Sequence, residues 1–283
     1  MTRFSLVVAT MGRDADIAVL LDSVLAQAWP DVEIIIVDQN KDNRVAPVVA
    51  AYEKRLPIIH IRTPRPHANA ARNLGLGRAG GDVVAFPDDD CILPPGTLSK
   101  VARTMEHEGA DVLTGPSASP AGGLGSGRWQ PESAPITLRN VWTSVIEFNL
   151  WLKRGVAVAL GGFDEKLGPG SVYGSAEGND LVARAIAAGH RCWYERPLEV
   201  IHPDKRLTDV ATARAYTYGA GLGVVLARHR PPFMTWFAFF WRPLVGVAVS
   251  LLRGRRHHAG YYWQTFRGRL AGFRAQPGLD GAA

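Results

Sequence analysis

Over the first 115 residues, short apolar runs rich in β-branched residues alternate with segments of helical periodicity. Such a run is typical of a buried strand, and apolar residues repeating every three or four positions are typical of a helix that covers a sheet. We expect strands at 4–10, 33–37, 58–62, 83–86 and 111–114, and helices at 14–28, 45–55, 68–76 and 95–107. Strands alternating with helices form right-handed βαβ units. The pattern predicts an α/β fold with a mostly parallel mixed sheet flanked by helices, whose ligands bind beyond the carboxyl ends of the strands.

The pattern is less regular further along the chain. Residues 117–127 and 168–178 are rich in glycine and are expected to be loops. Residues 140–160 are mostly apolar and are expected to form a helix followed by a strand, and residues 181–188 resume helical periodicity. A G-x-G-x-x-G match at 75–80 follows a helix and precedes a strand, which is the reverse of the order that a dinucleotide site requires. We interpret it as a helix end and a turn.

The positive charge is concentrated at the C-terminal end. The net charge is +6, and residues 203–283 carry 12 Lys and Arg against 3 Asp and Glu. The longest apolar stretch, 233–252, lies in the same region. A basic block beside a Trp- and Phe-rich stretch is expected at a membrane surface with anionic lipids. The alternative is a pair of helices packed on the rest of the protein. No nucleic acid partner is expected, because no recognised binding motif accompanies the charge.

The stretch 233–252 is 20 residues long, enough to cross a bilayer as a helix. Arg242 and Pro243 interrupt its middle, where a charge costs about 3 kcal/mol on insertion scales and proline removes a backbone donor. Two half-length segments that lie in the membrane interface, or that dip in and out of it, are therefore expected rather than one clean span, and the choice between a spanning and an interfacial C-terminus stays open. The basic residues of 253–258 would then lie on the cytoplasmic side of the cell membrane. The short apolar run at the N-terminus and the presence of only two cysteines favour a cytosolic compartment over export.

Three consecutive carboxylates, Asp88, Asp89 and Asp90, follow the strand expected at 83–86. They repel one another, and at the end of a buried strand they are costly unless a cation compensates them. Because alternate residues of an extended chain share a side, Asp88 and Asp90 can face one divalent ion. Carboxylate oxygens suit Mg²⁺ or Mn²⁺, which bridges protein carboxylates to phosphates. The alternative is a solvated acidic turn that caps the next helix.

Polar side chains also follow the other expected strands. Thr10 and Arg13 follow the first strand, Asp38 and Asn40 follow the second, and Arg72 lies on the helix before the acidic triplet. A carboxylate such as Asp38 can accept the imide N–H of a uracil-type base, and arginines offer planar donors to phosphates or base carbonyls. Together these residues predict a pocket for a nucleotide diphosphate.

These segments, in this order, resemble the family 2 glycosyltransferases of the GT-A fold. The resemblance is carried by V-V-A-T-M-G-R (7–13), V-D-Q-N (37–40), A-A-R-N (70–73), F-P-D-D-D (86–90), G-G-F-D-E (161–165), the stretch 168–181 and His202. It implies inverting transfer of a sugar, UDP-linked by expectation, from a nucleotide-diphospho-sugar to a lipid-linked or glycan acceptor in polysaccharide biosynthesis. Residues 1–205 would form the catalytic domain, and residues 206–283 would form a helical, membrane-associated region.

The resemblance also implies roles for individual residues. It places Asp38 at the nucleotide base, Asp88 near the ribose and the metal, and Asp90 on the metal. Asp89 would belong to the same nucleotide site. His202 would be a further ligand of the metal or of the diphosphate, although a histidine in such a stretch is otherwise an ordinary loop residue.

The catalytic base is the point at which this sequence departs from the family pattern. The family supplies a base from a Glu-Asp pair followed by x-Asp-Leu, and here the stretch reads Glu177, Gly178, Asn179, Asp180, Leu181. The usual Asp is therefore a glycine, and either Glu177, which is preferred, or Asp180 would serve as the base. A degenerate protein that binds nucleotide without turnover is an alternative. A nucleotidyltransferase is another.

Overall fold

The structure, a computed structural model, describes residues 1–204 and 208–275. These residues divide into two compact units. The first unit holds residues 1–163 and 181–204, and the second holds residues 164–180 and the described residues from 208 onward. The domain boundary expected at residues 205 and 206 lies outside the described residues. The division into a catalytic domain and a membrane-associated region therefore stays a prediction.

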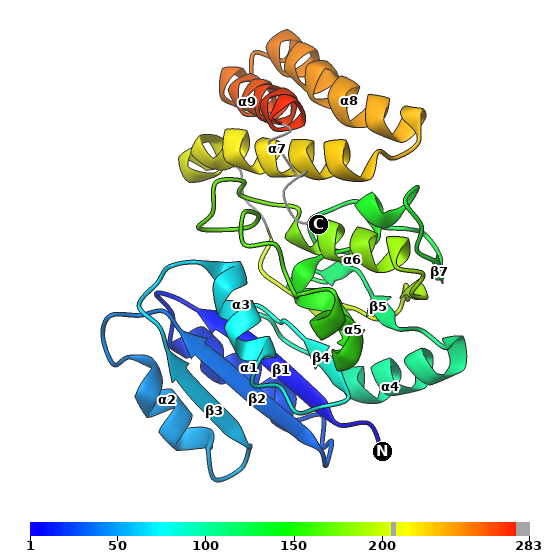
Figure 1. Ribbon diagram of the computed structural model, residues 1–283. Helices are drawn as coiled ribbons and strands as arrows, with labels where there is room; N and C mark the ends of the chain where they lie inside the picture. Colours follow the sequence, from blue (N-terminus) through cyan, green and yellow to red (C-terminus); the bar gives the residue numbers. More distant parts are fainter. Residues whose placement is uncertain (205–207, 276–283) are drawn as a thin grey trace. The chain divides into compact units, whose positions relative to one another are not determined.

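The first unit is built on a mixed sheet with the strand order β3-β2-β1-β4-β8-β5-β9-β7 (Figure 1). The first four are parallel, β8 is antiparallel to both its neighbours, and β9 is parallel to β5. A smaller sheet pairs β6 with β10. This arrangement confirms the predicted α/β class with a mostly parallel sheet. The strands are β1 (Phe4–Thr10), β2 (Val32–Asp38), β3 (Ile58–Arg62), β4 (Val83–Ala85), β5 (Val112–Thr114), β6 (Ser117–Ala118), β7 (Ala134–Pro135), β8 (Leu150–Lys153), β9 (Cys192–Tyr194) and β10 (Val200–Ile201).

Helices cover both faces of the large sheet, because alternate side chains of the buried strands point to opposite faces. Leu6 and Ile34 pack in one apolar core with α1, α2 and α4, whereas Val7 and Ile35 pack in a second core with α3, α5 and the later part of α6. These layers confirm the predicted helices on both faces. The helices are α1 (Ala15–Leu25), α2 (Val45–Tyr52), α3 (Ala68–Leu76), α4 (Thr97–Glu108), α5 (Arg154–Ala159) and α6 (Glu177–Ala187).

The register of the parallel strands places polar residues in one row at the carboxyl edge of the sheet. Thr10, the last residue of β1, pairs with Asp38, the last residue of β2. Asp38 pairs in turn with Arg62, the last residue of β3. The strands therefore end level with one another, and their last side chains share one edge. This is the edge at which an α/β sheet binds ligands.

The prediction for residues 140–160 is wrong in its order. The segment forms two 3₁₀ turns, Val141–Thr143 and Glu147–Asn149, then strand β8 and only then helix α5. β8 lies between β4 and β5 and pairs antiparallel with both. The chain thus uses its most apolar residues, Leu150, Trp151 and Leu152, as a fully buried strand. An apolar run of this length fits a buried strand or a buried helix equally well, and pairing with two neighbouring strands decides between them.

The glycine-rich segments are close to the prediction. Helix α3 ends at Leu76 and Gly77 caps it, which confirms that the glycines of 75–80 end a helix. The segment 117–127 differs at its start, because residues 117 and 118 form β6 rather than loop. β6 pairs in parallel with β10, so these two residues are tied to the strand that precedes His202.

The second unit contains three long helices, α7 (Asp209–His229), α8 (Phe233–Leu252) and α9 (Arg256–Arg274). Helices α7 and α9 pack backbone against backbone through glycines. A Cβ atom added at Gly223 would lie 2.2 Å from the carbonyl oxygen of Arg269, and one at Gly272 would lie 2.0 Å from that of Ala220. No other residue type fits at these two positions without moving the helices apart.

Helix α8 corrects a second prediction. The stretch 233–252 is one continuous helix with Pro243 inside it, not two half-length segments. Proline lacks the N–H that would bond to the carbonyl oxygen of Phe239, four residues earlier. The guanidinium of Arg269, on α9, donates a hydrogen bond to that oxygen instead. A tertiary contact therefore satisfies the group that proline leaves open. Among the described residues, α8 is the one helix whose length and composition would allow it to cross a membrane.

Candidate functional site

The acidic triplet lies just beyond β4, and its middle member is bound to Thr10, the last residue of β1, and to Arg13 in the turn after it. Thr10 donates a hydrogen bond of 2.6 Å from its hydroxyl to Asp89 Oδ2, and Arg13 Nη1 donates one of 3.0 Å to Asp89 Oδ1. Arg13 also forms an ion pair with Asp90. Residues predicted from two separate strand ends, that of β1 and that of β4, are thus in direct contact. Asp89 and Asp90 therefore face the other predicted residues rather than solvent.

Burial and neighbouring charges act in opposite directions on the pKa values of Asp89 and Arg13. Burial raises the pKa of Asp89 to about 6, although Thr10 and Arg13 favour its charged form. For Arg13, burial disfavours the charged form, but Asp89 and Asp90 outweigh it and raise the pKa of the guanidinium. Asp89 is therefore an interior carboxylate that depends on Arg13 for its charge compensation.

Arg72, on α3, reaches the first member of the triplet. Its Nη2 atom donates a hydrogen bond of 3.0 Å to Asp88 Oδ1, and its Nη1 atom donates one of 3.0 Å to Asn69 Oδ1. The guanidinium also lies over the ring of Phe163, 5.5 Å from its centroid. The Arg72 side chain is 7% exposed, whereas that of Asp88 is 36% exposed. Arg72 thus holds Asp88 from the interior, and the open side of Asp88 remains accessible to solvent.

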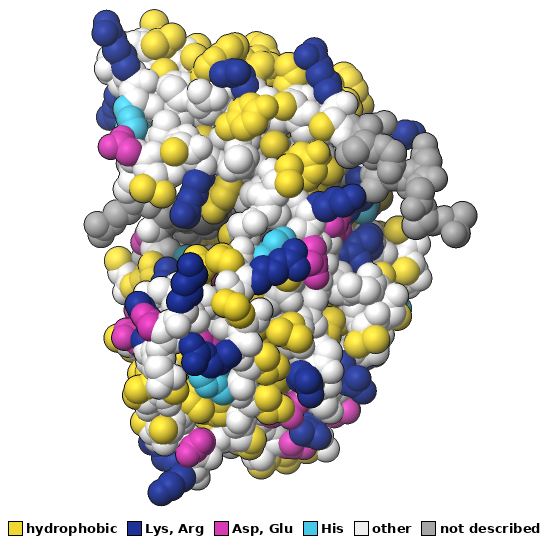
Figure 2. All heavy atoms as spheres, turned by 60° about the vertical axis from the view of Figure 1, so that its left-hand side comes forward, with side chains coloured by type: hydrophobic (Ala, Val, Ile, Leu, Met, Phe, Trp, Pro, Cys, Tyr) yellow, Lys and Arg dark blue, Asp and Glu magenta, His cyan; other side chains and the backbone are white. Residues whose placement is uncertain are grey.

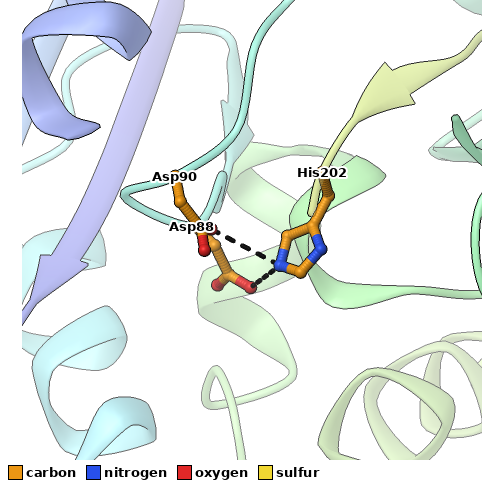
Figure 3. Close-up of side chains that lie close together, drawn as sticks. All are labelled: Asp88, Asp90 and His202. Atoms are coloured by element: carbon orange, nitrogen blue, oxygen red, sulfur yellow. Dashed lines mark ion pairs between the residues drawn. The ribbon is translucent and has the colours of Figure 1, made fainter. Parts of the chain in front are cut away.

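Asp88, Asp90 and His202 come together as a possible metal site (Figure 3). One ligand atom from each lies within 4.8 Å of the other two. His202 Nε2 is 3.4 Å from Asp90 Oδ1 and 3.8 Å from Asp88 Oδ2. Local backbone pairing produces this approach, because Ile92 and Ile201 exchange backbone hydrogen bonds of 2.9 and 3.0 Å just beyond the triplet and just before His202.

The donor set fits a divalent cation. Asp90 Oδ1 is buried and has no hydrogen-bond partner among the described residues, which is costly for a carboxylate oxygen unless a cation binds it. The His202 ring stacks on Phe148 at a centroid distance of 4.4 Å, and its Nδ1 atom lies 2.8 Å from the carbonyl oxygen of Pro203. That contact favours the proton on Nδ1, which directs the lone pair of Nε2 toward the carboxylates.

The alternative interpretation of the triplet, an acidic turn that caps the next helix, is wrong. Helix α4 begins at Thr97, its N-cap is Gly96, and no side chain caps it. Asp89 is 8% exposed and the Asp90 side chain is 10% exposed. The acidic residues therefore lie inside the site and not in a solvated turn.

Asp38 and Asn40 lie in a second group, next to Thr10 along the sheet edge. Asp38 Oδ1 accepts hydrogen bonds of 2.8 Å from both the backbone and the side-chain nitrogen of Asn40. Asn40 Oδ1 accepts one of 2.6 Å from the backbone N–H of Gly12. This contact holds the turn after β1, where Gly12 has a φ of 81° that favours glycine. The two predicted residues therefore shape the loop between β1 and α1.

The residues that bind the other oxygen of Asp38 were not predicted from the sequence. His60 Nε2 lies 3.1 Å from Asp38 Oδ2, and Arg62 Nε lies 4.0 Å from it. The Asp38 side chain is 1% exposed, so an imide N–H could reach it only by replacing one of these partners. The sequence contained a pattern that could have predicted them, because His60 and Arg62 are alternate residues at the end of β3, the strand that pairs with β2 beside Asp38.

The two candidates for the base lie in the second unit, in the first turn of α6. Asp180 is fully buried, and its Oδ1 atom is 2.6 Å from Arg228 Nη1 and 2.9 Å from His229 Nε2. Arg228 also donates a hydrogen bond of 2.8 Å to Asp164 Oδ2. Glu177 is 4% exposed. Arg228 and His229, at the end of α7, are contacts that the sequence analysis did not predict.

Two curated relatives show sequence similarity over the first part of the chain. The uncharacterized glycosyltransferase YwdF of Bacillus subtilis is 33% identical over 118 residues, which is 40% of this chain and 43% of that protein. The GalNAc(5)-diNAcBac-PP-undecaprenol beta-1,3-glucosyltransferase of Campylobacter jejuni is 31% identical over 116 residues, which is 40% of this chain and 38% of that protein. The matched region thus spans less than half of the length of either relative.

Two solved structures share the fold over nearly the whole chain. Residues 1–349 of Staphylococcus aureus TarS, in complex with UDP-GlcNAc, match with a TM-score of 0.62 at 16% identity, covering 94% of this chain and 90% of that one. The mannosyltransferase PcManGT of Pyrobaculum calidifontis, in complex with GDP-Man and Mn²⁺, matches with a TM-score of 0.67 at 14% identity, covering 98% and 88%. At these identities the likeness shows the fold, which confirms the predicted GT-A fold.

The family assignment rests on a longer match. The model of "Glycosyl transferase family 2" matches residues 5–161, which include most of β1 and all of β2, the acidic triplet and β8. More than half of the chain therefore follows the family pattern, and the resemblance stated from the motifs is confirmed. This chain belongs to glycosyl transferase family 2.

Proposed function

We propose that this protein transfers a sugar from a nucleotide-diphospho-sugar, UDP-linked by preference, to a hydroxyl group of a lipid-linked or glycan acceptor, with inversion at the anomeric carbon. The observation that carries the proposal is the cluster of Asp88, Asp90 and His202 at the carboxyl edge of the sheet. A buried Asp90 oxygen without a hydrogen-bond partner among the described residues fits a bound Mg²⁺ or Mn²⁺ ion.

Asp88, Asp90 and His202 would hold the ion. When bound, a divalent cation neutralises the negative charge that develops on the leaving diphosphate. The two arginines beside the cluster would have different tasks. Arg72 is nearly buried and orients Asp88, whereas the Arg13 side chain is 40% exposed and can also reach an anion outside the triplet. We assign the diphosphate to this edge and the nucleotide base to the neighbouring group formed by Asp38 and Asn40.

For the base we prefer Glu177. Asp180 is a weaker choice, because its Oδ1 atom is already held in ion pairs with Arg228 and His229. The base takes the proton of the acceptor hydroxyl while the hydroxyl oxygen attacks the anomeric carbon from the side opposite the diphosphate, and the bond to the diphosphate breaks. Attack from that side inverts the configuration.

The acceptor is assigned to a membrane lipid or a glycan, and the protein is assigned to the cytoplasmic side of the cell membrane. One of the relatives is named for action on an undecaprenol-linked substrate. In this chain the support is the apolar helix α8 and the basic composition of residues 203–283. A soluble donor and a membrane-bound acceptor would then meet at one surface.

Nucleotide binding and turnover test this proposal separately. The melting temperature of the protein should rise with UDP-sugars when Mn²⁺ is present, since a ligand that binds only the folded state stabilises it. Incubation with a suitable acceptor should release a nucleoside diphosphate, and no pyrophosphate should form from a nucleoside triphosphate. Absence of stabilisation by every nucleotide-sugar, with and without Mn²⁺, would refute the proposal.

A second function, binding of nucleotide-sugar without turnover, is favoured by one observation. Gly178 stands where the family carries an aspartate, so the usual base is missing. If wild-type protein binds UDP-sugar but releases no diphosphate, whereas Gly178→Asp restores release, the protein is a degenerate member of the family. If Glu177→Gln abolishes release by wild-type protein without weakening donor binding, the transferase is active and Glu177 is its base.

A further inference from the structure

Helix α8 exposes an apolar stripe along one side. Exposed large apolar side chains recur along it every three or four positions, and those side chains therefore share one face of the helix. Aromatic side chains from neighbouring turns are in contact along it, since the rings of Phe237 and Trp241 lie 6.1 Å apart. The stripe consists of Met234, Phe237, Trp241, Val245, Val249 and Leu252, with exposures of 71, 43, 54, 41, 38 and 88%, and Phe233 and Leu251 are exposed beside it at 69 and 57%. Isolated exposed apolar residues are ordinary, but a continuous stripe on one helix needs an apolar partner.

The opposite face of α8 is already occupied by α9. The ring of Phe273, on α9, lies 5.6 Å from that of Trp236 and 5.7 Å from that of Phe240. A Cβ atom added at Gly246 would lie 2.7 Å from the ring of Tyr262. α8 is thus not an isolated apolar rod, because it has one face fixed to its own unit and one face open.

The middle of α8 is unsuited to the centre of a bilayer. Arg242 lies there, roughly a quarter of a turn from Trp241, so it flanks the stripe and can extend toward a headgroup layer. Arg269 donates to the backbone carbonyl of Phe239, which Pro243 leaves open. If α8 crossed the bilayer, both arginines would lie near its midplane, or the carbonyl would lose its donor in hydrocarbon. α9 cannot accompany α8 as a second span, since α8 alone among the described helices has the composition of one.

The arginines at the end of the stripe indicate which kind of apolar surface would bind the stripe. Arg253, Arg255 and Arg256 follow Leu252 directly and are exposed. Residues 208–275 contain ten arginines and one carboxylate side chain, that of Asp209. Figure 2 shows one side of these helices, at the top of the view, where hydrophobic and basic side chains lie among one another. An apolar stripe bordered by arginines complements the interface of a bilayer with anionic lipids.

We propose that α8 lies in the plane of the membrane, with its stripe in the interface of a bilayer that contains anionic lipids, and that both of its ends stay on the same side. This inference deepens the membrane partner of the proposed function and rests on it. It replaces the choice between a spanning and an interfacial segment by a single arrangement. A second copy of this chain on the stripe is the competing occupant.

Vesicle flotation with the full-length protein tests the partner. Wild-type protein should float with vesicles of phosphatidylcholine and phosphatidylglycerol, and Phe237→Glu with Trp241→Glu should lower the partition coefficient at least tenfold. Val19→Glu, which adds the same charge at a 48% exposed valine of α1, should float like wild type. If the stripe variants float like wild type, or if they change the oligomeric state without affecting flotation, the proposal is wrong.

A second vesicle experiment tests the role of Arg253, Arg255 and Arg256. Replacing Arg253, Arg255 and Arg256 by glutamine should weaken partition into anionic vesicles on the order of 100-fold, since each charge contributes roughly a factor of five. A matched variant with Arg78, Arg103 and Arg139 changed to glutamine should be unaffected. An equal loss in both variants would show a nonspecific charge effect and contradict the proposed surface.

Cysteine labelling tests the orientation. Cys91 and Cys192 are buried, so Pro232→Cys and Arg255→Cys each add one exposed thiol, at opposite ends of α8. In membrane vesicles from producing cells, a membrane-impermeant maleimide should label both thiols from the cytoplasmic face. Labelling of the two ends from opposite faces would show that α8 spans the bilayer.

Nucleotide binding and flotation together separate the two proposals. Wild-type protein that binds the donor but does not float would refute this inference alone, and wild-type protein that floats but does not bind the donor would refute the proposed function alone.

Discussion

The buried ion pair between Arg228 and Asp180 allows a sharp prediction about the start of helix α6. The Asp180 side chain is fully buried and that of Arg228 is 18% exposed, and their atoms are 2.6 Å apart. Arg228→Leu would leave a buried carboxylate without its strongest partner, which typically costs 3–5 kcal/mol. Because His229 remains 2.9 Å from the same oxygen, the lower end applies, and we expect a loss of about 3 kcal/mol.

Urea unfolding at neutral pH measures this loss as a shift of the midpoint at unchanged slope. Arg103→Leu, on the exposed side of α4, is the control and should change stability by less than about 0.5 kcal/mol. Asp180→Asn combined with Arg228→Leu should cost less than the sum of the two single changes, because the double variant contains no unpaired buried charge. The reasoning fails if Arg228→Leu costs less than about 1 kcal/mol, or if the two changes are additive.

Two further predictions concern stability, one in each unit. Burial alone would raise the pKa of Glu33, but hydrogen bonds from Ser5 and Gly80 and the charge of Arg3 outweigh it and lower that pKa. The charged Glu33 therefore stabilises the folded protein above pH 4.5, and this contribution is lost as the pH falls through the lowered folded-state pKa. Glu33→Gln should therefore destabilise the protein by about 2 kcal/mol at pH 7 and by progressively less in acid, and a pH-independent difference in urea midpoints would contradict this. Gly223→Ala should destabilise the protein, because its Cβ would meet a backbone oxygen at 2.2 Å, whereas Gly260→Ala, with open space around it, should raise the melting temperature. Equal effects of the two alanines would refute the close approach of the helices.

The sequence was most informative where local pattern and strand ends determine the result. The run at 4–10 and the helix after it were correctly predicted, because both are buried and strongly periodic. The strand-end rule also brought Thr10, Arg13 and Arg72 together with the acidic triplet, and the structure places all of them in contact.

What the sequence did not reveal depends on contacts between distant segments. The strand β8 is chosen over a helix by pairing with β4 and β5, which no local pattern records. The continuity of α8 through Pro243 depends on a hydrogen bond from Arg269, 30 residues away in sequence from its acceptor Phe239. The partners of Asp180 lie 48 and 49 residues further along the chain, and nothing near Arg228 and His229 marks them as its partners.

The central claim is that Asp88, Asp90 and His202 bind a divalent ion that holds the diphosphate of an activated sugar. Calorimetric titration of UDP into the protein with and without Mn²⁺, for wild type, Asp90→Asn and the control Asp82→Asn, tests it most directly. Wild type and the Asp82 variant should bind UDP more tightly by a factor of ten or more when Mn²⁺ is present, and Asp90→Asn should lose that gain, because one missing charge-assisted contact is worth about 1.5–3 kcal/mol. Equal gains in all three proteins, or none in wild type, would contradict the claim.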